Sequence, residues 1–442
     1  MESGQGRQTS LESFGVIELQ GKHDIRQRNP DLDFRNVDNK YSTHRIHTYP
    51  AVMIGPVARY CIERYLSGVT NLLDPFVGSG SVLVEAAMKG IPSVGIDLNP
   101  LAVAISKARV QWYSPKQLRS SFSDLRRTIS EYLERKVVFD VPSTITNWEF
   151  WYNEKILQDL LTIKNAIDNS IGSESLKLFF KVTLSEIIRA ASYQRNGEFK
   201  RYRLPKEKIL SHEYDVFGNF ETMANYYING VEEYMYYRKQ FPQLLDPDVR
   251  LADSRYLDWM PDGQFDGLLT SPPYGDSQTT VAYGQFSRFS LELLDFDSNV
   301  PANQVDHVLL GGKKSSSRIP DHKIESVQLG LTLDKIREKD PKRANEVKKF
   351  FSDYFEAISE HSRVLGENSK LVYVVGNRTV KKVWVETDII TKEMFEQFGF
   401  KLKGIYYRDI PNKRMPSKNS PTNVKGERVT TMVNEYVVVM ER

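Results

Sequence analysis

Residues 74–81 read Asp74-Pro75-Phe76-Val77-Gly78-Ser79-Gly80-Ser81, and the local structure that they predict decides the fold. The apolar stretch 71–76 is typical of a short strand, and residues 81–89 follow it with a helical pattern. Glycines in the turn let the backbone pass close to a ligand, and the start of the next helix offers free N–H groups. The stretch therefore predicts a strand–turn–helix unit with a ligand at its turn.

An acidic residue follows this turn at the end of a second predicted strand, residues 93–97. Asp97 lies about 20 residues after Gly78, where a carboxylate can accept both ribose hydroxyls of a nucleoside cofactor. A Gly-x-Gly pattern alone is interpreted equally well as a structural turn. The strand, the helix and Asp97 together favour a nucleoside ligand.

The chemistry of the turn distinguishes between nucleoside cofactors. A dinucleotide site needs a third glycine, and Leu83 occupies that position. Asp74 places a carboxylate near the turn, which suits a cationic ligand better than a pyrophosphate. S-adenosylmethionine carries an ammonium and a sulfonium group, and we predict it as the cofactor.

A second motif, Ser271-Pro272-Pro273-Tyr274, directly follows a predicted strand at residues 265–270. Ligands of open α/β sheets bind beyond the carboxyl ends of the strands, so this loop is expected at the same crevice as the glycine turn. The two prolines restrict the backbone, and Tyr274 offers a flat face on which a base can stack. A proline-rich strand exit without chemistry is the alternative interpretation.

This loop suits one reaction in particular. An exocyclic amine on a base is a poor nucleophile because its lone pair is delocalised into the ring. Hydrogen bonds from the amine to Ser271 Oγ and to a proline carbonyl would favour a pyramidal nitrogen and direct its lone pair. We therefore predict four catalytic residues: Ser271, Pro272, Pro273 and Tyr274.

Strands alternating with helices predict an α/β protein whose parallel sheet is covered on both faces. Residues 115–245 interrupt this alternation with helical, aromatic-rich sequence. The predicted organisation is a polar N-terminal extension at 1–40, a cofactor-binding part at 41–114, an inserted helical target-recognition region at 115–245, and a catalytic part at 246–442.

The two motifs together resemble those of the DNA amino-methyltransferases of restriction–modification systems. DPFVGSGSVLVEA is similar to the family's motif I, and SPPY to its motif IV in the serine form associated with N4-cytosine enzymes. Tyr49 and Pro50 lie in a stretch, HTYPA, that resembles motif X, and Asp97 and Asp253 match motifs II and III. Adenine-N6 members usually carry Asp or Asn at the position of Ser271.

The resemblance implies a Rossmann-like methyltransferase fold with a mostly parallel seven-stranded sheet and an antiparallel last strand at residues 435–440. It also implies methyl transfer from S-adenosylmethionine to a flipped-out base in double-stranded DNA. The cofactor-binding residues predicted from the motifs are Tyr49, Pro50, Asp74, Phe76, Gly78, Gly80, Asp97 and Asp253.

Basic and aromatic residues alternate in residues 191–208, within the predicted insertion. Cations neutralise phosphates and aromatic rings stack on bases, so this segment is the predicted DNA contact. A solvated basic loop is the plain alternative. The residues that we predict to contact DNA are Arg195, Lys200, Arg201 and Arg203. The small polar residues 275–280 are interpreted either as a lid over the base or as an ordinary connector.

The composition excludes several classes of protein. Cys61 is the single cysteine, and the histidines show no paired spacing, so we expect no disulfide framework and no metal site. There is no long apolar run and no apolar leader, so we expect a cytoplasmic protein without a membrane partner. A separate restriction endonuclease is a possible partner.

Four functions remain open at this stage: N4-cytosine methylation of DNA, which we favour, adenine-N6 methylation of DNA, methylation of an RNA base amine, and a non-catalytic subunit. The intact SPPY tetrapeptide argues against the last of these. Methylation at C5 of cytosine needs a cysteine beside the base, and Cys61 instead lies in an apolar helical pattern ahead of the glycine turn.

Overall fold

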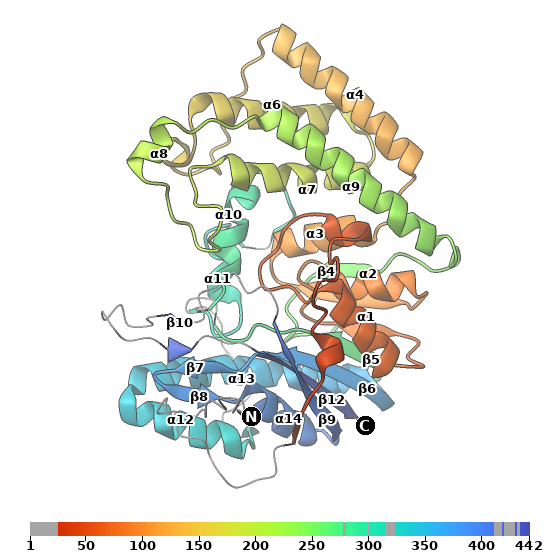
Figure 1. Ribbon diagram of the computed structural model, residues 1–442, viewed down its shortest axis with the longest axis vertical. Helices are drawn as coiled ribbons and strands as arrows, with labels where there is room; N and C mark the ends of the chain where they lie inside the picture. The colour runs from red at the N-terminus through yellow and green to blue at the C-terminus, as the bar shows by residue number, and fades with distance from the viewer. Residues whose placement is uncertain are drawn as a thin grey trace, which may run out of the picture.

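The computed structural model describes residues 25–276, 280–298, 300–313, 318, 323–410, 418–419, 429–430 and 434–442. Two layers of helices enclose a twisted sheet, and a block of long helices stands beyond one of these layers (Figure 1). α10 (Tyr283–Leu293) and α11 (Val305–Val308) lie between this block and the sheet.

The central sheet has the order β1-β9-β12-β6-β5-β2-β3-β4 among the described residues. Every pairing in it is parallel except those of β12, which runs antiparallel to both β6 and β9. Its strands are β1 (Arg26–Arg28), β2 (Leu72–Asp74), β3 (Ser93–Asp97), β4 (Asp248–Leu251), β5 (Phe265–Thr270), β6 (Leu365–Val375), β9 (Lys401–Asp409) and β12 (Asn434–Glu441). The predicted Rossmann-like α/β fold and the antiparallel last strand are confirmed.

The N-terminal edge of the sheet corrects the expected strand number. β1 pairs in parallel with β9, with Arg26 opposite Ile405, so the described sheet has eight strands and not seven. Arg26 also forms ion pairs with Asp388 at 2.5 Å and Glu386 at 2.6 Å. Residues 25–40 are therefore partly built into the fold, and are not a loose extension. The sequence of β1, Arg26-Gln27-Arg28, has no alternation of apolar residues that would predict a strand.

The strands bury alternate residues on opposite faces, as the two-residue period of a strand requires. Val372 and Val374 of β6 belong to one buried cluster, whereas Leu371 and Tyr373 belong to the other. The first face is covered by α1 (Gly55–Arg64), α2 (Ser81–Met88) and α3 (Pro100–Val110). The second is covered by α12 (Val327–Lys339), α13 (Pro341–Val364) and α14 (Thr387–Glu396).

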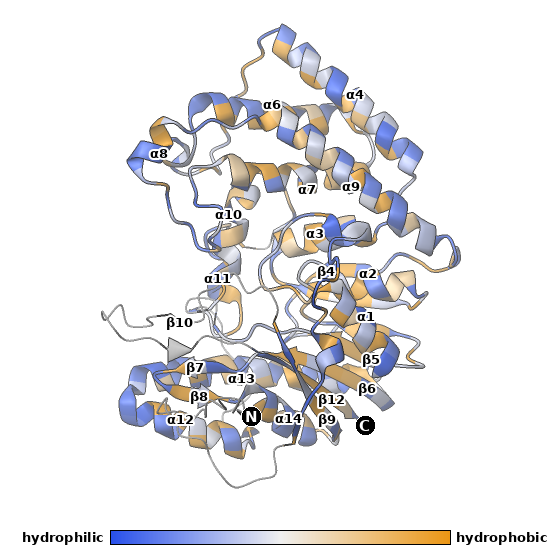
Figure 2. Ribbon diagram, viewed as in Figure 1, coloured by the Kyte–Doolittle hydropathy of each residue, from blue (hydrophilic) through white to orange (hydrophobic). Residues whose placement is uncertain are grey.

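Helices in the interior carry more apolar residues than helices at the surface of the molecule (Figure 2). α2 is mostly apolar, and each of its residues is buried, including Glu85, which pairs with His44 and Arg59. α4 (Pro115–Glu134) buries only the stripe Leu118, Phe122, Leu125 and Ile129, which is the spacing of a helix with one face on a core and one in water.

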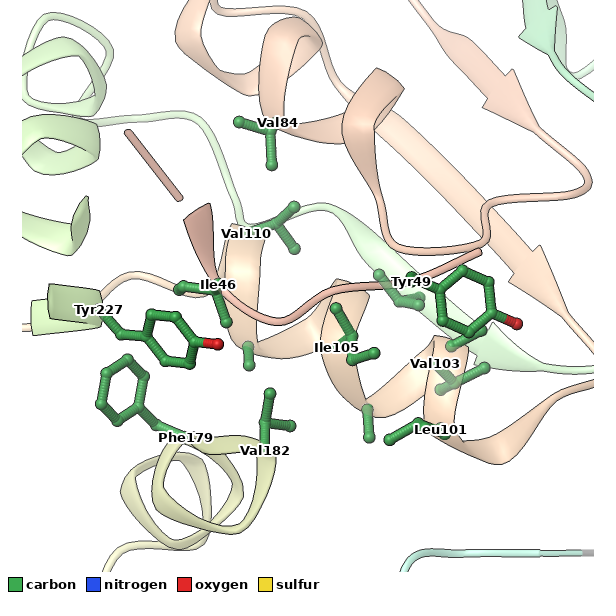
Figure 3. Packing of buried hydrophobic residues seen from close by; sticks show 14 of the residues in the cluster. Ile46, Tyr49, Val84, Leu101, Val103, Ile105, Val110, Phe179, Val182 and Tyr227 are labelled. Atoms are coloured by element: carbon green, nitrogen blue, oxygen red, sulfur yellow. The ribbon is translucent and has the colours of Figure 1, made fainter. Parts of the chain in front are cut away.

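The segment between α3 and β4 is helical. Besides α4 it contains α5 (Trp148–Trp151), α6 (Glu154–Ser170), α7 (Glu174–Ala191), α8 (Lys206–Leu210) and α9 (Val216–Arg238). Phe179 and Val182 of α7 and Tyr227 of α9 pack with Ile46 and Val110 in one cluster (Figure 3). The block of helices between α3 and β4 therefore shares a hydrophobic core with α2 and α3. This shared core fixes the position of the block relative to the glycine turn, which precedes α2.

Two short antiparallel strand pairs lie outside the central sheet among the described residues: β7 (Arg378–Val380) with β8 (Val383–Val385), and β10 (Lys418–Asn419) with β11 (Val429–Thr430). A short 3-10 segment, η2 (Pro30–Leu32), follows β1, and another, η3 (Ser42–Arg45), precedes α1. Within the described ranges, no helix combines the length and the apolar character needed to cross a bilayer.

Candidate active site

A cleft that opens to solvent lies beyond the carboxyl ends of β2, β3 and β5, with about 830 Å³ of space between its atoms when the open mouth is included. Its walls come from segments far apart in sequence, which meet because parallel strands present their carboxyl ends at the same edge. The predicted site residues that line it are Tyr49, Pro50, Asp74, Phe76, Gly78, Asp97, Asp253, Ser271 and Pro273. The glycine turn and the SPPY loop thus face one cavity.

The two glycines of the turn have different surroundings. Gly78 has φ +50°, and a Cβ placed there would lie 3.8 Å from the Tyr49 ring, at the cleft. Gly80 has φ +83° and precedes α2, and its Cβ would lie 3.0 Å from Ser106 Oγ and 3.1 Å from Ser106 Cα on α3. The missing side chain of Gly80 admits α3, and the described cleft lining does not include this residue. The predicted contact between Gly80 and the cofactor stays a prediction.

Asp97 is held by backbone N–H groups at the end of β3. Its two carboxylate oxygens accept from Gly78 N at 3.0 Å and from Asn99 N at 2.8 Å. Burial raises the pKa of Asp97 to about 6. The carboxylate is therefore oriented at the cleft but incompletely stabilised as an anion, and a ligand that donates hydrogen bonds would complete it.

Asp74 is the second buried acid at the cleft. Thr270 Oγ1 donates to it at 2.6 Å, and Phe76 N donates at 3.3 Å. Burial, with a smaller contribution from nearby Asp97, raises the pKa of Asp74 to about 7. Two carboxyls with raised pKa values at one cleft suit a cationic ligand, because a cation stabilises their ionised form. S-adenosylmethionine meets this requirement.

The aromatic walls include residues that the sequence analysis did not select. Tyr283, from α10, stacks on Tyr49 with 5.9 Å between ring centroids. Asn99 Nδ2 donates to Tyr49 Oη at 2.9 Å and to Ser287 Oγ at 2.7 Å. No sequence signal distinguishes Tyr283 or Asn99, because both depend on α10 packing beside the start of α3.

Asp253 and Phe76 are fixed from behind. Arg255 Nε donates to Asp253 Oδ1 at 2.9 Å, and Arg255 Nη2 donates to Asp253 Oδ2 at 2.5 Å. Phe76 meets His361 edge to face at 5.6 Å. Burial lowers the pKa of His361 to about 3, so this imidazole is neutral at physiological pH. Both site residues thus have restricted side chains before any ligand binds.

Arg109 connects two parts of the cofactor cleft. This buried guanidinium donates from Nε to Ile46 O at 2.8 Å, from Nη1 to Ser79 Oγ at 3.0 Å, and from Nη2 to His47 O at 2.9 Å. Burial lowers its pKa to about 10, which still leaves it charged at neutral pH. Arg109 therefore ties the segment before Tyr49 to the glycine turn.

The SPPY loop is hydrogen-bonded to the C-terminal part of the sheet. Ser271 Oγ lies 3.0 Å from Tyr274 Oη, which donates to Glu435 Oε1 of β12 at 3.2 Å. Tyr274 and Pro272 do not belong to the described cleft lining, whereas Ser271 and Pro273 do. The hydroxyl of Tyr274 is thus engaged behind the loop, and its predicted stacking role remains a prediction.

The four predicted DNA contacts lie apart from the described cleft lining and differ from one another. Arg195 is exposed and Lys200 half-buried. Arg201 stacks on Phe289 at 4.1 Å and on Trp151 at 4.3 Å. Arg203 stacks on Phe150 at 4.1 Å. Arg201 and Arg203 therefore have a packing role as well as a charge.

The segment after Tyr274 is only partly described. Residues 277–279 of the predicted lid lie outside the described residues. Asp276 is buried and pairs with Arg343 at 3.2 Å, which anchors the exit of the SPPY loop to α13. In the part of the chain that the structure describes, no group of three or more His, Cys, Asp or Glu side chains is placed to hold a metal ion.

Comparison with known proteins places this site in a family. No family model matches the chain. The type II methyltransferase M.MvaI of Kocuria varians is 37% identical over 94% of this chain and 95% of its own length. The type II methyltransferase M.MjaII of Methanocaldococcus jannaschii is 20% identical over 88% of this chain and 81% of its own length. A solved structure, TrmN from Thermus thermophilus, covers 88% of this chain and 49% of its own at 10% identity, with a TM-score of 0.29 that is too low to support an argument.

The alignment with the Kocuria varians enzyme covers almost the whole chain. The cleft, where the SPPY loop lies beside a site suited to a cationic nucleoside, is consistent with that similarity. The chain therefore belongs to the type II DNA methyltransferases of restriction–modification systems, and its methyl donor is S-adenosylmethionine.

Proposed function

We propose that the chain methylates the exocyclic N4 amine of cytosine, within a specific site in double-stranded DNA and on a flipped-out base. The observation that carries the proposal is the position of Ser271. It lines the same cleft as Asp74, Asp97 and Gly78, so an amine beside its hydroxyl would face the methyl donor.

S-adenosylmethionine supplies an electrophilic methyl group when it is bound. Asp97 would accept hydrogen bonds from the ribose hydroxyls, and Asp253 would lie near the adenine. Gly78 would let the methionine part pass close to the backbone, beside Tyr49 and Pro50. Ionised Asp74 would contribute negative charge to the cation-binding side of the cleft. Each of these assignments is supported by the position of the residue in the cleft lining.

Ser271 Oγ and a proline carbonyl would accept hydrogen bonds from the target amine. Such contacts favour a pyramidal nitrogen whose lone pair is directed at the methyl group, and positioning and electrostatics supply the rate gain. No covalent bond between enzyme and base is needed. This agrees with Cys61, which is buried in α1 and whose pKa burial raises to about 12, a poor setting for a nucleophilic thiolate.

DNA would contact the basic segment at residues 195–203, where Arg195 is the most accessible of the predicted cations. The helical block that contains this segment shares a core with α3, so DNA bound there would be held at a defined position relative to the cleft. The proposal also includes three further points. Residues 115–245 form the target-recognition region, a separate cognate endonuclease is a partner, and the location is cytoplasmic.

Adenine N6 is the second candidate target, because a pyramidal amine beside Ser271 fits either base. Serine at position 271 favours cytosine, because the SPPY tetrapeptide resembles the serine form of motif IV associated with N4-cytosine enzymes. A base amine in RNA is a weaker third candidate.

The test is chemical identification of the product. DNA incubated with the protein and S-adenosylmethionine is digested to nucleosides and analysed by mass spectrometry. N4-methylcytosine is expected. N6-methyladenine would overturn the choice of base alone, 5-methylcytosine would overturn the mechanism, and methylation of RNA in preference to DNA would overturn the substrate class.

A further inference from the structure

A row of three hydrogen-bonding groups lies behind the catalytic loop, and it ends on a strand that none of the sequence motifs covers. We call it the hydroxyl chain: Ser271 Oγ, Tyr274 Oη and the Glu435 carboxylate. The distances are 3.0 Å from Ser271 to Tyr274 and 3.2 Å from Tyr274 to Glu435. β12 places Glu435 behind the loop because β12 is inserted antiparallel between β6 and β9.

The far end of the hydroxyl chain has a fixed charge partner. Arg408 Nε, on β9, donates to Glu435 Oε2 at 2.8 Å, and Arg408 Nη1 donates to Leu32 O at 3.0 Å. Glu435 and Arg408 expose 14% and 5% of their side chains, so both are largely shielded from water. The ion pair holds the carboxylate with its other oxygen, Oε1, directed at Tyr274.

This arrangement determines which way each hydrogen points. An ionised carboxylate can only accept hydrogen bonds, so the single hydrogen of Tyr274 is used toward Glu435. Tyr274 Oη is then an acceptor for its other neighbour, and Ser271 donates to it. The hydrogen of Ser271 is thereby directed away from the cleft, and its lone pairs remain for a group inside the cleft.

We propose that Glu435 is a positioning residue that, through Tyr274, keeps Ser271 as a hydrogen-bond acceptor. The inference rests on the proposed function, because an amine that is to be methylated must donate N–H to Ser271 and keep its own lone pair free. A serine hydrogen directed into the cleft would instead bind that lone pair and suppress the attack. The inference holds for the amine of cytosine and for that of adenine alike.

The isosteric change Glu435→Gln tests the direction of the chain. The amide oxygen of glutamine would face the Arg408 guanidinium, because the guanidinium has no acceptor atom, and the NH₂ group would then face Tyr274. Every hydrogen bond in the hydroxyl chain would reverse, and the hydrogen of Ser271 would point into the cleft. We expect kcat to fall at least about 10-fold, while the Kd values for S-adenosylmethionine and DNA change less than about 3-fold.

The matched control is Glu441→Gln, on the same strand. Glu441 forms an exposed ion pair with Lys403 at 2.5 Å and has no part in the site. It should leave kcat unchanged. Thermal unfolding of each variant measures any general loss of stability separately from turnover.

Tyr274→Phe removes the middle of the hydroxyl chain and separates positioning from a merely structural role. Without the tyrosine hydroxyl, Ser271 rotates freely and Glu435 has no route to it. The double variant Glu435→Gln with Tyr274→Phe should therefore have the kcat of Tyr274→Phe alone, and a higher kcat than Glu435→Gln alone. Additive losses in the double variant, or a normal kcat in folded Glu435→Gln, would overturn the inference.

Turnover is followed as the incorporation of labelled methyl groups into DNA, which does not depend on which base is modified. A product other than N4-methylcytosine would thus overturn the proposed choice of base without affecting this comparison. Conversely, a correct product with additive variants would overturn the role of Glu435 and leave the proposed function intact.

Discussion

Binding of S-adenosylmethionine should strengthen markedly between pH 5.5 and pH 7.0, because two buried carboxyls at the cleft ionise in this range. Burial raises the pKa of Asp74 to about 7 and that of Asp97 to about 6. A cationic ligand that also donates to Asp97 binds the form in which both groups are ionised. In the ligand-free cleft this form is rare at pH 5.5 and common at pH 7.0.

The magnitude follows from the two pKa values. If the ligand requires both ionised groups, its affinity is about 60-fold weaker at pH 5.5 than at pH 7.0, or about 2.4 kcal/mol. Asp74 accounts for most of this difference, because its pKa is the higher of the two. The range stays below the usual pKa of an α-amino group, about 7.7–8.0, so the ammonium of the ligand stays charged.

The variant Asp74→Asn removes the larger contribution. An asparagine oxygen can still accept from Thr270 Oγ1, which donates to Asp74 at 2.6 Å in the native protein. The pH dependence should then shrink to about 4-fold, the share expected from Asp97. Absolute affinity at pH 7.0 should fall as well, since one negative charge is lost.

Isothermal titration calorimetry in buffers of different ionisation enthalpy measures both the affinity and the protons released on binding. Binding should release protons between pH 5.5 and 7.0 in the native protein and fewer in Asp74→Asn. Asp334→Asn, on the exposed face of α12, is the control and should match the native protein. A native affinity that is constant within about 3-fold across this range, or an Asp74→Asn protein that keeps the whole dependence, would refute the reasoning.

Four further predictions concern other parts of the molecule. In the ligand-free protein, Asp74 and Asp97 should contribute less to the free energy of unfolding as pH rises from about 4 to 7. The reason is that in this range the folded state binds more protons than the unfolded state. Chemical denaturation of the native and Asp74→Asn proteins at several pH values measures this contribution. Arg109→Met should weaken S-adenosylmethionine binding by at least about 1–3 kcal/mol, because it frees the segment before Tyr49 and leaves carbonyls unpaired; unchanged affinity by calorimetry in a folded variant would contradict this role. Arg195→Ala should weaken DNA binding and reduce the slope of log K against log salt by about 1, and an unaltered slope would mean that Arg195 does not touch phosphate. Cys61→Ser should keep most methyl transfer while lowering the melting temperature, and a folded but inactive variant would overturn direct transfer to an amine.

Several features of the site follow from the local sequence. The glycine turn, Asp97 and the SPPY loop each lie at the end of a strand, and a strand of a parallel sheet delivers its last residues to one edge whatever the rest of the chain does. Their meeting at one cleft was therefore predictable before the fold was known. The apolar helical pattern around Cys61 is typical of a helix face turned to the core, and Cys61 is buried.

Other features depend on which segments meet. Gly80 resembles Gly78 in sequence, yet a Cβ at Gly80 would meet Ser106 of α3, whereas one at Gly78 would lie beside Tyr49. The crossing of α2 and α3 decides which glycine lies at the helix contact. Arg201 and Arg203 have the composition of phosphate ligands, but aromatic rings of α5 and α10 cover their guanidinium faces. A run of basic residues in the sequence shows where positive charge lies. It does not show which of these side chains are packed against neighbouring residues.

The sequence by itself predicted the strands and helices around the two motifs, a nucleoside site at the glycine turn and an amine-methylating role for the SPPY loop, because these predictions depend on residues close together in the chain. It did not predict β9. Only the tertiary structure decided that β1 closes the sheet edge beside β9 and that Glu435 lies behind Ser271. The physical reason is separation along the chain: Tyr274 and Glu435 are 161 residues apart, and only the antiparallel insertion of β12 between β6 and β9 brings the carboxylate to the loop.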